Sequence, residues 1–127
     1  MDLIDDNWLV ANYSPKPTIA SILNYPNAQN LPLESVIIIP YFSTTLIAEA
    51  LSWREWNYIC ECWVTSHTDE DAVESMLTEV VRILDNYNPT GYWVVYPSDF
   101  TNKSDKNASP KRYKIIFNIN CRKEESY

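Results

Sequence analysis

The clearest pattern of apolar and polar positions lies in the second half of the chain. Residues 58–65 alternate between the two classes, which predicts a strand with one more polar face. After a polar break at residues 66–68, apolar residues recur at three- and four-residue steps up to Leu84, which predicts a long amphipathic helix. Residues 92–96 and 111–122 have strand patterns.

The side chains predicted to be buried where helix and last strand meet are Val73, Met76, Leu77, Val80, Leu84, Ile115, Phe117 and Ile119. The side chains predicted to be exposed on the helix are Glu74, Ser75, Thr78, Glu79 and Arg82.

The first half has weaker patterns. Residues 1–12 are predicted to hold a short N-terminal helix, because acidic residues near its start suit the positive end of the helix dipole. Residues 18–24 and 35–42 are predicted strands, and Pro40 is expected to limit the second to a sheet edge or to end it early. Residues 44–55 fit a helix or a strand, and we favour a strand.

These elements indicate an α+β fold. We expect a mostly antiparallel sheet of four to six strands, with the long amphipathic helix packed on one face and the short helix at the N-terminus. The polar segment 98–110 is predicted to be a long exposed loop. The length of 127 residues predicts one domain over residues 1–127.

Composition and charge narrow the functional classes. Hydrophobic residues make up 46% of the chain, which argues against intrinsic disorder, and a single glycine, Gly91, excludes glycine-rich phosphate-binding loops. The net charge of −7 is distributed unevenly: residues 1–97 are strongly acidic and residues 98–127 are basic. We expect no nucleic-acid specificity, because dedicated nucleic-acid binders usually carry a basic domain. The acidic N-terminus and the lack of a long apolar run predict a protein that is neither secreted nor membrane-bound.

The residues that could carry chemistry are few. Cys60, Cys62 and Cys121, with His67 as the only histidine, lack the number and spacing of zinc ligands, so we interpret them as three reduced thiols and a solvated imidazole. The carboxylates after Thr68, the predicted helix N-cap, are explained by the helix dipole. We therefore expect no catalytic residue, no metal, no cofactor and no enzymatic activity.

The order of elements from residue 58 to residue 123 is that of a known family. A strand at residues 58–66, an amphipathic helix at 72–84, a strand at 92–96, a polar loop and an alternating strand at 112–120 follow one another. This order resembles the small tail-terminator and tail-completion (neck) proteins of tailed phages and related archaeal viruses. The resemblance implies a virion subunit, assembled in the host cytoplasm, that forms a homo-oligomeric ring, expected to be a hexamer. Its implied partners are the tail-tube and head-connector proteins.

Two oppositely charged segments are the candidate contacts between neighbouring subunits, since each copy in a ring must offer two complementary patches. The basic members are Lys103, Lys106, Lys111 and Arg112, and the acidic members are Asp69, Glu70, Asp71 and Glu74. The alternative function is a small inhibitor, encoded by a virus or mobile element, that binds a host protein through an acidic surface. An enzyme with a dispersed site ranks third.

Overall fold

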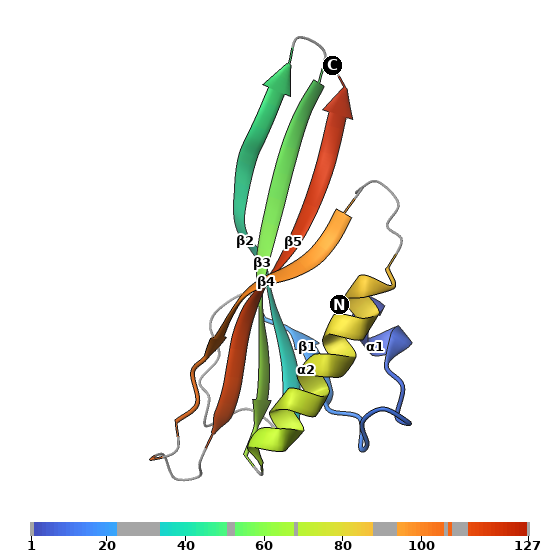
Figure 1. Cartoon of the computed structure of the whole chain (residues 1–127), viewed down its shortest axis with the longest axis vertical. Coiled ribbons are helices and arrows are strands. Elements are labelled where there is room, and N and C mark those ends of the chain that lie inside the picture. The colour runs from blue at the N-terminus through green and yellow to red at the C-terminus, as the bar shows by residue number, and fades with distance from the viewer. Residues whose placement is uncertain are drawn as a thin grey trace.

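A computed structural model gives the fold (Figure 1). The structure describes residues 2–22, 34–50, 53–67, 69–87, 94–105, 107 and 112–126. In chain order the elements are α1 (Asp2–Asn7), β1 (Thr18–Ser21), β2 (Glu34–Ala50), β3 (Trp53–Ser66), α2 (Glu70–Asp85), β4 (Val94–Asn102) and β5 (Tyr113–Ser126).

The described strands form one sheet in the order β1-β2-β3-β5-β4. The pair β1–β2 is parallel, and the other three pairs are antiparallel. The central strand β3 pairs with β5 from Trp53, opposite Ser126, to Ser66, opposite Tyr113. The predicted α+β class and mostly antiparallel sheet are therefore confirmed.

Helix α2 lies on one face of the sheet (Figure 1). It begins after Asp69, whose Oδ1 accepts a hydrogen bond from the backbone N–H of Asp71 at 2.9 Å. The N-cap is thus Asp69 rather than Thr68, which lies outside the described residues. The apolar residues of α2 pack with Phe117 and Ile119 of β5 in the main core, and Leu77 is half-buried against that core. The fully buried apolar residues of α2 are Val73, Met76, Val80, Ile83 and Leu84.

Helix α1 is shorter than predicted and ends at Asn7 instead of residue 12. Contacts from elsewhere in the chain occupy the groups that would continue it. The carbonyl of Asp5 accepts a hydrogen bond from Lys16 Nζ at 2.9 Å, and the N–H of Leu9 donates to Glu79 at 2.7 Å. The helical hydrogen bond from the Leu9 N–H to the Asp5 carbonyl is therefore replaced by these two bonds. Trp8, between these residues in the chain, is buried in the main core.

Strand β2 covers the predicted strand at residues 35–42 and continues to Ala50, so Pro40 does not end it. The favoured strand at residues 44–55 is thus divided between the end of β2 and the start of β3, and residues 51–52 lie outside the described part of the chain. The β1 partners on β2 stop at Ile38, and the register with β3 shifts between Ile39 and Ser43. Pro40 thus lies just beyond the pairing with β1 and inside an irregularity, where its missing N–H is tolerated.

The prediction of an exposed loop at residues 98–110 is wrong for its first part. Strand β4 extends to Asn102, and the ladder with β5 continues through a bond from Lys103 N–H to the Lys114 carbonyl at 2.9 Å. A bridge between Asp105 and Arg112 follows. Polar residues are compatible with this edge strand because one side of it faces water. Residues 106 and 108–111 lie outside the described part of the chain.

Candidate assembly surface

Three strands continue beyond the part of the sheet that the helices cover, and together they form an arm (Figure 1). The arm consists of residues 43–50 of β2, 53–59 of β3 and 120–126 of β5, with β3 in the middle. Among the described residues, the arm contributes only Cys121, at its base, to the main core. A sheet is normally stabilised by a second layer that covers its apolar side chains. No helix of the described residues covers the arm, whereas α2 covers one face of the rest of the sheet (Figure 1).

Large apolar side chains are exposed on the arm. The exposed fraction is 43% for Leu46, 40% for Ile47 and 36% for Trp53. The outer strands of the sheet reach at most the base of the arm: β1 stops opposite Ile38 of β2, and β4 pairs with β5 only as far as Arg122. Both edges of the arm beyond these points have no strand partner within the described residues. Unpaired edges with exposed apolar side chains are typical of surfaces that bind another chain.

The polar groups of the arm are incompletely satisfied. Glu49 and Arg54 form an exposed ion pair with an Oε2–Nε distance of 3.2 Å. Within the described residues of the arm, three buried side-chain atoms have no hydrogen-bond partner: Trp56 Nε1, Asn57 Oδ1 and Arg122 Nε. Each such atom costs about 1–3 kcal/mol relative to a solvated one. Such atoms reduce the stability that folding of the arm provides.

The predicted charged contact residues differ in how far they are exposed to solvent. Asp69, Asp71 and Glu74 are exposed at the start of α2, and Glu70 is half-buried.

The basic patch is only partly at the surface. Lys103 is exposed after β4, whereas Lys106 and Lys111 lie outside the described residues. Arg112 is 3% exposed, its Nη1 donates to Thr65 Oγ1 at 2.9 Å, and its Nη2 contacts Nε2 of His67. Arg112 is thus part of the interior, and the expectation of a solvated His67 is wrong, since that imidazole is half-buried against Arg112.

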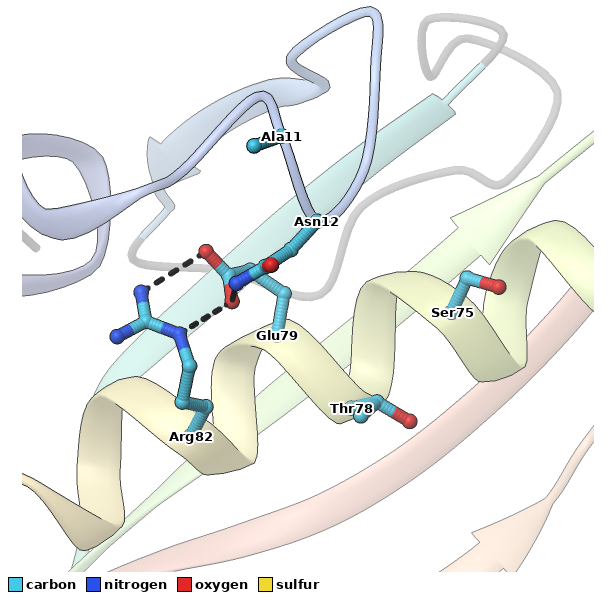
Figure 2. A pocket seen from close by; sticks show the side chains of 6 residues that line it. All are labelled: Ala11, Asn12, Ser75, Thr78, Glu79 and Arg82. Atoms are coloured by element: carbon cyan, nitrogen blue, oxygen red, sulfur yellow. Dashed lines mark hydrogen bonds and ion pairs between the residues drawn. The ribbon is translucent and has the colours of Figure 1, made fainter.

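Glu79 was expected on the solvent face of α2, but it is only 2% exposed and connects α2 to the N-terminal segment (Figure 2). Its carboxylate accepts hydrogen bonds from the Leu9 N–H at 2.7 Å and from Asn12 Nδ2 at 2.9 Å. Arg82 adds two more, from Nε at 2.5 Å and from Nη2 at 2.9 Å. The hydrogen bonds from Arg82 above all, and then those from Leu9 and Asn12, lower the pKa of Glu79 to about 2. The three-residue spacing of Glu79 and Arg82 was the available sequence signal, but it did not reveal burial.

A recess of about 540 Å³ lies beside Glu79, and Figure 2 shows the side chains around it. The carboxylate of Glu79 and the guanidinium of Arg82 point toward each other across their ion pair. Because each is already bonded to the other, neither is poised as a general acid or base. This arrangement holds the N-terminal segment on α2.

A smaller apolar cavity of about 240 Å³ lies between α1, the end of α2 and the sheet. Cys60 and Cys121 line it, and Cys62 is fully buried close by in the core. Burial raises the pKa of Cys60 to about 11, and it also raises the pKa of the other two thiols. All three are therefore protonated at neutral pH, and a thiol must lose its proton to act as nucleophile or metal ligand.

Comparison with known protein families and with curated proteins finds no match to this chain. Within the described ranges, no group of three or more His, Cys, Asp or Glu side chains has an arrangement suited to a metal ion. The helices of the described residues are too short and too polar to span a lipid bilayer.

Proposed function

We propose that this protein is a structural subunit that assembles with copies of itself, as a tail-terminator or head–tail joining (neck) ring does in a virion. The observation that supports this proposal best is the arm, whose exposed apolar side chains and open strand edges lie outside the helix-covered body. An assembly subunit needs such a surface because the contact energy must come from area that the isolated copy leaves exposed. The resemblance in the order of elements supplies the virion location and the tail-tube and head-connector partners.

The mass of the full-length chain in solution tests this proposal. Mass photometry and negative-stain microscopy of the purified protein, with and without a tail tube, are expected to reveal a closed ring, with six copies as the expected number. The variant Trp53→Lys should shift the population toward monomer, because it places a charge among the exposed apolar residues of the arm. Val10→Lys is the matched control, since Val10 is also exposed but lies far along the chain from the arm, in the N-terminal segment. A chain that stays monomeric at all concentrations and beside the tail tube would contradict the proposal.

The second candidate function is an inhibitor that binds a basic host protein. The exposed carboxylates of Asp69, Asp71 and Glu74 at the start of α2 favour it, because acidic clusters steer cationic partners. This candidate requires a monomer or dimer whose binding to one purified cationic protein is lost in Asp71→Lys/Glu74→Lys. Ring assembly that is unaffected by these two substitutions would argue against it.

A further inference from the structure

The outer edge of β2 along the arm has no strand partner among the described residues. Its residues 43–50 pair with β3 on one side only, and no described strand lies on the other side. Natural proteins protect such edges with lysines, prolines or β-bulges. Residues 43–50 include no lysine and no proline, and their single charged residue, Glu49, is paired with Arg54. Their backbone irregularity is the register shift between Leu46 and Ala48.

The edge also has an apolar centre. Trp56 of β3 lies opposite Leu46, Glu55 lies opposite Ala48, and the register shift between Leu46 and Ala48 leaves Ile47 without a residue opposite it. Leu46 and Ile47 are both exposed. An extended backbone with two adjacent exposed apolar side chains offers main-chain hydrogen bonds and hydrophobic contact together, as strand addition requires.

We propose that this edge binds the same edge of a second copy, in antiparallel orientation about a two-fold axis at Ile47. In this arrangement Ile47 lies against Ile47 of the second copy, and Leu46 is opposite Ala48. Glu49 is opposite position 45, a threonine, so that like charges do not face each other. The two arms then form one continuous sheet of six strands.

Charge favours a second copy at the arm over contact through the body. The arm has three cations and four carboxylates, a net charge of −1, whereas the whole chain has −7. Most of the repulsion between two identical acidic chains is therefore kept away from this contact. A two-fold contact also covers both β2 edges at once and leaves neither open for further addition. The inference shares self-association with the proposed function but does not need a ring.

Cross-linking of the full-length chain tests this contact. In Ile47→Cys, the introduced thiols meet at the two-fold axis, so mild oxidation should give a disulfide-linked dimer in most of the protein at micromolar concentration. Val10→Cys carries a thiol at an exposed position outside the arm, 59% exposed against 40% for Ile47, and serves as the matched control. It should give at least tenfold less dimer under the same conditions, and the parent chain controls for Cys60, Cys62 and Cys121.

Two further measurements on the unoxidised protein complete the test. Hydrogen exchange should slow at the amides of residues 43–50 as the concentration of the parent chain rises. Ile47→Lys should weaken dimerisation at least tenfold, whereas Val10→Lys should not. Equal cross-linking of both cysteine variants, or association without protection of residues 43–50, overturns the inference. Two-fold dimers that persist undiminished in Ile47→Lys would refute this contact, whether or not rings form. Dimers that are lost in Ile47→Lys, in a chain that never forms rings, would support this contact and contradict the proposed ring.

Discussion

The body and the arm use the same sheet in different ways. In the body, strands β2, β3 and β5 carry buried side chains against α1 and α2, including Phe117 and Val64, which have no exposed surface. In the arm the same three strands continue without that layer and expose Leu46 and Trp53. The β3–β5 ladder is continuous through both parts, so the pairing of these two strands does not distinguish them. The β2–β3 register, in contrast, shifts between Ile39 and Ser43 and again between Leu46 and Ala48. The difference teaches that apolar burial sets the stability of each part, while an uncovered extension of the sheet is available for contacts with other molecules.

The largest effect is expected from truncating the body's core. Phe117→Ala removes a fully buried ring that packs beneath α2 and stacks on Phe100 with a centroid distance of 5.1 Å. It should lower the free energy of unfolding by about 3–5 kcal/mol. Urea denaturation followed by circular dichroism measures the change. A loss below about 1 kcal/mol would mean that the body is not the stabilising half.

A smaller loss is expected when the N-terminal segment is released from α2. Glu79→Ala removes the acceptor of the bonds from Leu9 and Asn12 and should cost about 2 kcal/mol of unfolding free energy. The loss should be accompanied by faster hydrogen exchange at the Leu9 amide. The matched control is Glu74→Ala, on the exposed side of the same helix, which should change stability by less than about 0.5 kcal/mol.

The contribution of Glu79 should also depend on pH. The pKa of this carboxyl is about 2 in the folded chain, below the ordinary value of 4.5. Its stabilisation is therefore fully present above about pH 4.5 and is lost as the pH falls toward 2. Denaturation curves of the parent and of Glu79→Gln should differ most at neutral pH and converge near pH 2. A constant difference between pH 7 and pH 2 contradicts this assignment.

The smallest effect is expected on the arm. Leu46→Ala shortens a side chain that is 43% exposed, so the unfolding free energy should fall by about 1 kcal/mol or less. Association of copies, measured by mass photometry, should weaken instead. A stability loss as large as that of Phe117→Ala would show that the arm is covered within a single chain, and it would remove the contrast between the two parts.

The spacing of apolar residues was sufficient to predict α2 and β5, because the residues of these elements themselves determine which face is buried. The apolar steps from Val73 to Leu84 predicted where α2 packs, and the alternation around Phe117 predicted the face of β5 that meets it. Element ends were less predictable because distant groups decide them. Helix α1 ends at Asn7 because the Leu9 N–H donates to Glu79 instead of continuing the helix. The polar residues after Ser98 form a strand because β5 supplies their backbone hydrogen-bond partners.

The charged residues illustrate the same limit. Local pattern placed Glu79 and Arg112 at the surface, because a charge is normally solvated. Glu79 is buried because three partners satisfy its oxygens, two of them from residues about 70 positions away in the chain. Arg112 is buried beside Thr65 and His67, which β3 brings next to the start of β5. No window of neighbouring residues contains these partners.

The sequence by itself determined the α+β class, the antiparallel character of most of the sheet and most of the core residues of α2 and β5, because these follow from the spacing of apolar side chains within each element. The tertiary structure alone decided that β2, β3 and β5 align over their full lengths and extend past the helices as an arm. The length of a strand depends on whether a neighbouring strand offers a hydrogen-bond partner to each of its backbone groups. The exposure of Leu46 depends on how far along the sheet α2 extends. Both are relations between segments far apart in the chain, so they become defined only when the chain has folded.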